Sequence, residues 1–101
     1  MNEFQVTCIN KSHPHAGHEH ITEIGGLAGG GWRLSKDTAV YQIDNNIAAF
    51  YTVDYTTGKK AYVGVVREVG KVPYLRTHAD GKYNDNLLAQ TACPIAYKRV
   101  A

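Results

Sequence analysis

The sequence is short of cysteine and has no long apolar run. It contains two cysteines, Cys8 and Cys93, among its 101 residues. Residues 1–10 lack the basic start and the apolar stretch of a secretory signal, so we expect no export signal. No segment approaches the roughly 20 apolar residues that a membrane-spanning helix needs. We therefore expect a cytoplasmic protein with no membrane partner and with both thiols reduced, because that compartment argues against a Cys8–Cys93 disulfide.

Aromatic residues other than tyrosine are also scarce. The chain holds two phenylalanines and one tryptophan against seven tyrosines, a bias toward rings that often cover a thin core or face a partner. Hydrophobic residues make up 44% of the chain and charged residues 20%, which excludes a disordered protein. A chain of this size buries about 60–70% of its unfolded surface. Residues 1–101 are therefore expected to form a single domain with an ordinary core.

Negative charge is scarce in the second half of the chain. The formal net charge is +2. Residues 1–50 contain three Lys or Arg and five Asp or Glu, whereas residues 51–101 contain eight and four. The halves thus carry −2 and +4, so an anion would dock more favourably on the second half. The imbalance by itself is too small to indicate nucleic acid.

The first half predicts two strands and one helix. "EFQVTCIN" alternates, with Phe4, Val6 and Cys8 on one face, as in a half-buried strand. "HITEIGG" predicts a second strand, joined to the first by a long loop. "GGLAGGG" then forms a flexible break without the lysine of a phosphate-binding loop. A short helix should begin after Ser35 as N-cap and end at Asn45-Asn46; its apolar stripe is Ala39, Val40 and Ile43.

The second half predicts only strands and turns. "AAFYTVDY" and "KAYVGVVREV" flank "TTGK", which indicates a hairpin with Gly58 in its turn. "VPYLRT" is a further strand that starts at Pro73, "ADGK" is a turn, and Pro94 prevents a helix in the tail. We expect an α+β fold in which about five strands, in the order β-β-α-β-β-β, form one small antiparallel sheet with one short helix packed on it. The expected core is Phe4, Val6, Trp32, Val40, Ile43, Val63 and Leu87.

Four of the five histidines lie in the segment "HPHAGHEH". Residues two apart in an extended chain point the same way, and imidazole suits zinc, nickel or copper. One hypothesis is therefore a metal site made of His13, His15, His18 and His20. The alternative is a solvated loop, because structural zinc sites usually include thiolate and draw on two chain segments.

Aromatic and basic residues alternate in the second half. Rings on a sheet face with interleaved cations suit single-stranded nucleic acid, because bases stack and phosphates pair. The alternative is that the tyrosines pack across strands and the lysines keep the hairpin soluble. The residues of this nucleic-acid or nucleotide hypothesis are Tyr51, Tyr55, Lys59, Lys60, Tyr62, Arg67 and Tyr74.

The stretch "YLRTHADGKYNDNLLAQTACP" is the most distinctive part of the chain. It resembles the C-terminal signature of a bacterial family described as domain of unknown function 3892, through Tyr74, Leu75, Arg76, Thr77, Asp80, Gly81, Asn86, Leu87, Leu88, Cys93 and Pro94. "VTCI", "HEHITEIGG", Trp32 and "FYTVD" fall in the order of that family. The resemblance implies a bacterial or phage-associated cytoplasmic domain and no particular chemistry.

The same stretch suggests a polar pocket. Thr77, Asp80 and Asn86 are expected to converge near one sheet edge, with Arg76 beside them for an anion, although a loop that simply closes the fold is the alternative. No nucleophile, paired carboxylates or cysteine–histidine dyad has the local context of an active site. We expect a small binding or interaction module without catalytic activity or cofactor. It would bind a protein or small molecule, or else nucleic acid, as a monomer or homodimer.

Overall fold

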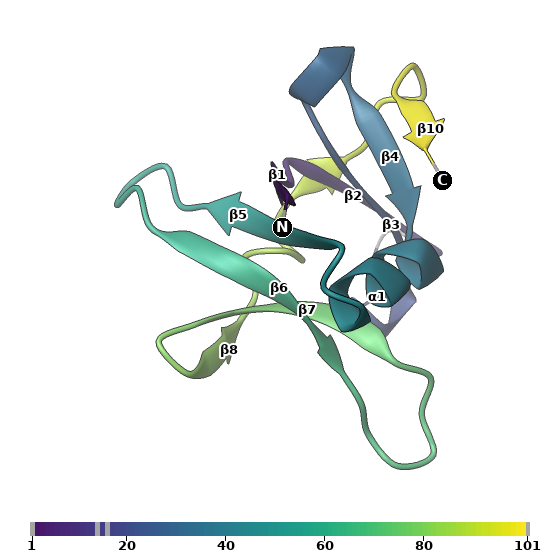
Figure 1. Cartoon of the computed structure of the whole chain (residues 1–101), viewed down its shortest axis with the longest axis vertical. Coiled ribbons are helices and arrows are strands. Elements are labelled where there is room, and N and C mark those ends of the chain that lie inside the picture. The colour runs from purple at the N-terminus through teal and green to yellow at the C-terminus, as the bar shows by residue number, and fades with distance from the viewer. Residues whose placement is uncertain (1, 14, 16, 101) are drawn as a thin grey trace.

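In the part of the chain that the structure describes, ten strands form two five-stranded sheets, and one α-helix contacts both (Figure 1). This computed structural model describes residues 2–13, 15 and 17–100. The strands are β1 (Asn2–Gln5), β2 (Cys8–Lys11), β3 (Ile21–Gly26), β4 (Trp32–Ser35), β5 (Ala48–Val53), β6 (Lys60–Val66), β7 (Tyr74–Ala79), β8 (Lys82–Asn84), β9 (Thr91–Ala92) and β10 (Lys98–Val100). The helix is α1 (Lys36–Asp44), and two 3-10 turns are η1 (His18–His20) and η2 (Ala28–Gly30).

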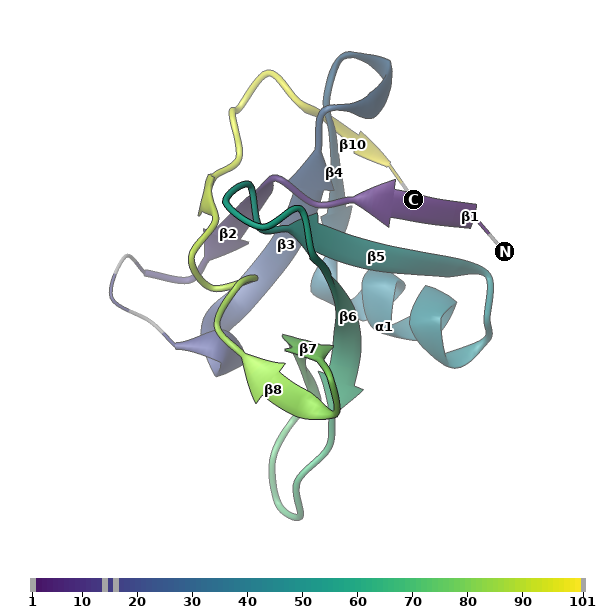
Figure 2. The ribbon, with the colours of Figure 1, turned by 90° about the vertical axis from the view of Figure 1, so that its left-hand side faces the viewer.

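Sheet A has the strand order β1-β5-β6-β7-β8, and sheet B has the order β10-β4-β3-β2-β9. In sheet A, β1 runs parallel to β5 and the other pairs are antiparallel. Sheet B is an antiparallel centre, β4-β3-β2, with a parallel strand at each edge. In Figure 2, β1 and β5 of sheet A run across the view, whereas β3 and β4 of sheet B run steeply. A small α+β fold with one helix is therefore confirmed, but the predicted single sheet is wrong in both sheet count and strand order.

The predicted first strand is in fact two strands that belong to different sheets. The Val6 N–H donates to the Tyr51 carbonyl at 2.7 Å and extends the pairing of β1 with β5. The next amide, that of Thr7, donates to the Gly25 carbonyl at 2.8 Å and opens the pairing of β2 with β3. The chain thus passes from sheet A to sheet B between residues 6 and 7. A strand that changes sheets forms the corner of a two-sheet fold.

Apolar side chains from both sheets and from α1 meet in one core. The rings of Phe4, Trp32 and Phe50 pack together with centroids 5.9–6.0 Å apart. All seven predicted core residues belong to this cluster: Val6, Val63 and Leu87 are buried, and Phe4, Trp32, Val40 and Ile43 are partly buried against it.

The helix is confirmed at both ends. The Ser35 hydroxyl accepts from the Thr38 N–H at 3.2 Å, which satisfies one of the free amides of the first turn. Asn45 is the C-cap, and Asn46 takes a positive φ of 56°. The helix contacts β3 and β4 of sheet B and β5, β6 and β7 of sheet A. No helix in the described residues has the length and apolar character to cross a membrane.

The hairpin of β5 and β6 is confirmed, with Gly58 at a φ of 75°. β7 begins directly after Pro73, and the "ADGK" turn leads into β8. The sequence did not indicate β4, because the preceding glycines were interpreted as a break, nor the short strands β8, β9 and β10. These strands are two to four residues long, which is too short for an alternating pattern to appear.

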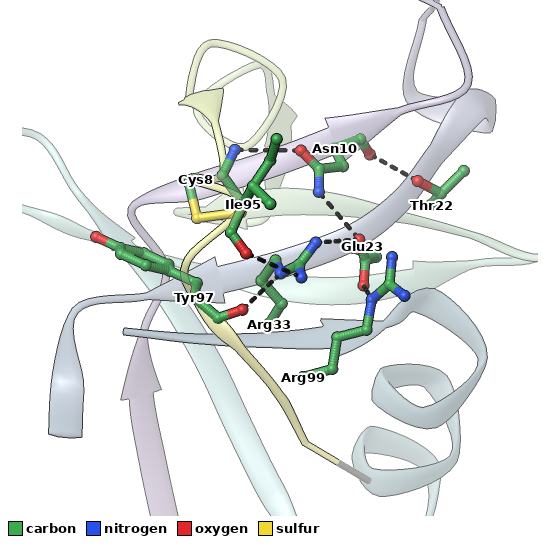
Figure 3. The surroundings of a disulfide bond; sticks show 9 residues. Cys8, Asn10, Thr22, Glu23, Arg33, Ile95, Tyr97 and Arg99 are labelled. Atoms are coloured by element: carbon green, nitrogen blue, oxygen red, sulfur yellow. Dashed lines mark hydrogen bonds and ion pairs between the residues drawn. A yellow bond between two sulfur atoms is a disulfide. The ribbon is translucent and has the colours of Figure 1, made fainter. Parts of the chain in front are cut away.

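Cys8 and Cys93 form a disulfide, so the prediction of two reduced thiols is wrong (Figure 3). Parallel pairing of β9 with β2 places Thr91 opposite Cys8 and Ala92 opposite Ile9. Cys93 follows at once, with its Cα 4.8 Å from that of Cys8. The prediction rested on compartment alone, and nothing in the sequence shows that segments 85 residues apart are adjacent strands.

Gly25 provides the space in which the disulfide lies. A Cβ on Gly25 would stand 2.8 Å from the Cys8 Sγ, 2.9 Å from the Cys93 Sγ and 2.5 Å from the Trp32 carbonyl oxygen. All three distances are below van der Waals contact, and one involves the backbone of the neighbouring strand. The strand β3 therefore needs a glycine at this point.

Reducing the disulfide should lower the free energy of unfolding by about 2–4 kcal/mol, because the bond closes a long loop in the unfolded chain. Urea titrations of the oxidised protein and of the protein in dithiothreitol measure the difference. The Cys93→Ser variant should match the reduced protein and should not respond to the reductant. An unchanged urea midpoint on reduction would contradict a stabilising role.

The substitution Gly25→Ala should destabilise the fold by about 1–3 kcal/mol, the usual cost of overpacking. The matched control is Gly17→Ala, since a Cβ at Gly17 meets nothing within 4 Å. Thermal unfolding followed by circular dichroism measures both variants. Equal melting temperatures for the two variants would contradict the close packing of the disulfide and the Trp32 carbonyl against Gly25.

Candidate nucleic-acid interface

The outward face of sheet A carries a row of ring-bearing side chains. Directly opposed residues lie on the same face of a sheet. The register places one such row across all five strands, in the order Gln5, Tyr51, Tyr62, His78 and Tyr83. The rings of Tyr51 and Tyr62 have centroids 5.9 Å apart. We refer to Tyr51, Tyr62, His78 and Tyr83 as the aromatic row.

Strand alternation turns the aromatic row away from the core. The sequence neighbours of Tyr51 and Tyr62 point inward and are buried: Phe50, Thr52, Ala61 and Val63. Tyr51 and Tyr62 themselves are partly exposed, and His78 and Tyr83 are exposed. The row is therefore a surface that solvent reaches.

Two cations stand over the ends of the aromatic row. The Lys60 Nζ lies 4.4 Å from the ring centroid of Tyr51, and the Arg76 Cζ lies 5.5 Å from that of Tyr83. Both distances fall in the range of a cation–π contact. Lys60 precedes Tyr62 by two residues and Arg76 precedes His78 by two, on antiparallel strands. The two cations therefore lie on opposite sides of the row.

A groove of about 410 Å³ borders the row on its lysine side. Its lining residues are Lys59, Lys60, Tyr62, His78, Ala79 and Asp80. Within the described ranges, no carboxylate lies in ion-pair distance of Lys59, Lys60 or Lys82. Arg76, by contrast, has the Asp85 carboxylate 3.1 Å from its Nη2. Two lysines without a carboxylate in ion-pair distance among the described residues therefore line the groove, together with the carboxylate of Asp80.

Polar contacts from β1 hold two of the rings on this side of the molecule. The Tyr62 hydroxyl donates to the Glu3 Oε1 at 2.9 Å. This hydrogen bond, with smaller effects of burial and of the nearby charge, raises the pKa of Tyr62, so the phenol is neutral at physiological pH. The Gln5 Nε2 donates to the Tyr55 hydroxyl at 3.0 Å and draws the β5–β6 turn toward the row.

The structure separates the predicted nucleic-acid residues into two groups. Tyr51, Tyr55, Lys59, Lys60 and Tyr62 gather at or beside the aromatic row.

The other two lie away from the row. Arg67 forms an ion pair with Asp44 of α1. Tyr74 is buried, and its hydroxyl donates to the Glu68 Oε1 at 2.7 Å. The contact with Glu68 raises the pKa of Tyr74, more than burial does.

Sequence reasoning missed His78 and Tyr83, although a signal for both was present. A two-residue turn at Asp80-Gly81 places Ala79 opposite Lys82, and therefore His78 opposite Tyr83. Both residues of this turn have positive φ, 54° and 75°, which is the conformation of a tight hairpin turn. Treating "ADGK" as a hairpin would have paired His78 with Tyr83, but their place beside Tyr62 depends on the pairing of β6 with β7.

The four residues of the predicted polar pocket do not share one site. Thr77 is fully buried; its hydroxyl donates to the Asn84 side chain and accepts from the Leu87 N–H at 3.1 Å. The Arg76 Nε donates to the Asn84 carbonyl at 3.3 Å, and the Asn86 N–H donates to the Asn84 Oδ1 at 3.0 Å. These three residues organise the loop around Asn84, whereas Asp80 lines the groove. Ligand binding by the four residues stays a prediction.

The histidines of the predicted metal site are placed in different surroundings. The rings of His13 and His20 have centroids 5.2 Å apart, and His15 is exposed. The His18 Nε2 lies 3.4 Å from the Asp85 Oδ1. Burial and the positive charge of Arg76 lower the pKa of His18 despite that carboxylate. Nowhere in the described ranges do three His, Cys, Asp or Glu side chains gather as metal ligands, and metal binding stays a prediction.

A comparison with protein-family models finds one match, to "Protein of unknown function (DUF3892)", over residues 5–89. The matched region contains the whole aromatic row and its cations, whereas Cys93 and Pro94 lie beyond it. Neither the curated proteins nor the solved structures contain a match to this chain. Because the match spans most of the 101 residues, the chain belongs to the DUF3892 family.

Proposed function

We propose that this protein is a non-catalytic module that binds single-stranded nucleic acid on the outward face of sheet A. The observation that carries the proposal is the row of four opposed ring-bearing residues on adjacent strands, with a cation over each end. Aromatic faces on a sheet stack unpaired bases, and neighbouring cations neutralise phosphates.

The dimensions of the row favour a short segment of the strand. Adjacent strands are spaced by about 4.8 Å, so Tyr51 and Tyr83, three strands apart, are separated by about 14 Å. A row of this length accommodates about two or three splayed bases. Every base has a π-face, so stacking of this kind tolerates many sequences. Lys59 and Lys60, which line the groove, would hold the phosphates along it.

The charge distribution supports the same proposal. The second half of the chain supplies the surplus of positive charge, and the two lysines that line the groove, Lys59 and Lys60, have no carboxylate in ion-pair distance within the described part of the chain. Residence in the cytoplasm of a bacterial or phage-infected cell, where single-stranded nucleic acid occurs, is part of the proposal.

Tyr62→Ala should weaken binding to a fluorescein-labelled 12-nucleotide oligo-dT by about tenfold, because stacking of one base on a ring contributes about 1–3 kcal/mol. Fluorescence anisotropy at low salt measures the affinity. The matched control is Tyr41→Ala, which removes an exposed tyrosine of α1 outside the aromatic row and should leave affinity unchanged. Equal losses in the two variants would contradict binding on this face.

Lys60→Glu should bind oligo-dT more weakly than the wild-type protein, and this loss of affinity should grow as the salt concentration is lowered. The slope of log affinity against log salt should therefore be smaller for the variant. Each phosphate contact on a single strand contributes about 0.7 to that slope. Lys36→Glu, at the start of α1, is the charge-matched control. Absence of oligo-dT and oligo-U binding by the wild-type protein at low salt would refute the proposal and leave a protein-binding or small-molecule-binding module.

A further inference from the structure

Residues 91–100 form a strap over the outer face of sheet B. The strap begins as β9 at the edge of β2 and ends as β10 at the edge of β4, so one short segment pairs with both edges of the antiparallel centre. Register places Cys8 opposite Gly25 and Gly25 opposite Arg33, on one face. The strap crosses this face, which is opposite to the face that enters the core (Figure 3).

Polar contacts hold the middle of the strap. The Arg33 Nε donates to the Tyr97 carbonyl at 2.9 Å and its Nη2 to the Ile95 carbonyl at 3.4 Å. The Cys93 N–H donates to the Asn10 Oδ1 at 3.2 Å, and the Arg99 Nε donates to the Glu23 Oε2 at 3.1 Å.

Glu23 is ionised in this cluster. Burial raises its pKa, but the Asn10 hydrogen bond and the charges of Arg99 and Arg33 outweigh burial, and the pKa lies below its usual value. Figure 3 shows these side chains converging on the Glu23 carboxylate.

Little apolar surface anchors the strap. Cys93 is its one buried residue among those described and Tyr97 is partly buried, whereas the others are exposed, with Ile95 at 91%. The Arg99 side chain is 71% exposed, and exposed ion pairs contribute little. The disulfide is therefore the strongest single attachment of the strap to the rest of the protein.

We propose that the Cys8–Cys93 disulfide is a redox-controlled latch: a dithiol reductant opens it, and the strap leaves the outer face of sheet B while the core stays folded. Departure would free the edges of β2 and β4 and uncover the side chains of Asn10, Glu23 and Arg33. Unpaired strand edges accept further strands, so the reduced protein would present a surface that the oxidised protein covers. This inference is independent of the proposed nucleic-acid binding, which uses the other sheet.

The chemistry is a thiol–disulfide exchange. One thiolate of the dithiol attacks the Cys93 sulfur, which is the less buried of the two, and the Cys8 thiolate leaves. The second thiolate of the reductant then attacks the reductant sulfur that is bonded to Cys93. This step releases the Cys93 thiolate. Two electrons pass from the dithiol to the protein, both cysteine thiolates take up a proton, and the reductant becomes a cyclic disulfide.

Hydrogen exchange followed by mass spectrometry tests the latch on the intact protein, with dithiothreitol as the reductant. In the oxidised protein, the amides of Cys93, Tyr97 and Lys98 donate hydrogen bonds. After reduction, exchange in peptides covering residues 91–100 should accelerate at least tenfold, while peptides covering β3 and β6 keep their protection. Trp32, the single tryptophan and the partner of Lys98 in the register, should become more accessible to acrylamide quenching.

Two variants control this experiment. Cys93→Ser should show fast exchange of the strap without reductant and no response to it. Arg99→Gln removes the exposed ion pair but keeps the disulfide, so it should leave the oxidised strap protected. If Cys93→Ser does not fold, the reductant titration of the wild-type protein still decides the outcome.

Two results would overturn the latch. Unchanged protection of residues 91–100 after complete reduction would show that hydrogen bonds alone hold the strap. Loss of protection throughout β3 and β6 would show that the disulfide maintains the whole fold rather than one segment. Thiol labelling after each reaction confirms that reduction was complete.

Discussion

The fold depends on one strand that changes sheets. The two consecutive amides of Val6 and Thr7 donate to carbonyls in different sheets, so a single residue step ends sheet A and begins sheet B. Gln5, just before the step, is the first position of the row that continues through Tyr51. Cys8, just after it, carries the disulfide. Both candidate functional features therefore derive their positions from the same short segment of chain.

Both sheets turn one face to the core and one face outward, but only the outward face of sheet B is covered by another segment of the chain. Each sheet turns one face to the common core, where Ile24 and Leu34 of sheet B meet Phe50 and Leu75 of sheet A. The outward face of sheet A is left open and presents rings and cations. The outward face of sheet B is covered by the chain's own strap. A small domain buries a smaller fraction of its surface than a large one. In this domain the ten residues of the strap cover an outer face of sheet B and add little to the core.

Glycines leave space for the groups on these outer faces, and polar side chains hold the adjoining loop in place by hydrogen bonds. Gly25 gives the disulfide room against the strand, and Gly64 does the same for His78, since a Cβ on Gly64 would lie 3.1 Å from that ring. Thr77 and Asn84 satisfy one another across the β7–β8 pair and give the Leu87 amide an acceptor. The polar stretch that resembles the family signature thus builds the loop that pins Leu87 into the core and holds the end of the aromatic row in place.

Local sequence determined the elements whose information is local. Ser35 and Asn45 bound a helix because capping is a contact within one turn, and Gly58 and Gly81 mark turns because only a few residues accept their backbone angles. Alternation also determined which tyrosines of β5 and β6 share a face. It could not reveal the step between Val6 and Thr7, because Cys8 continues the apolar alternation although it lies outside the core cluster, whereas Ile9 enters that cluster. Tertiary structure alone decided which strands are neighbours, because pairing between distant segments depends on the whole chain packing around one core. It separated Arg67 and Tyr74 from the aromatic row and added His78 and Tyr83 to it. It also brought Cys93 to Cys8.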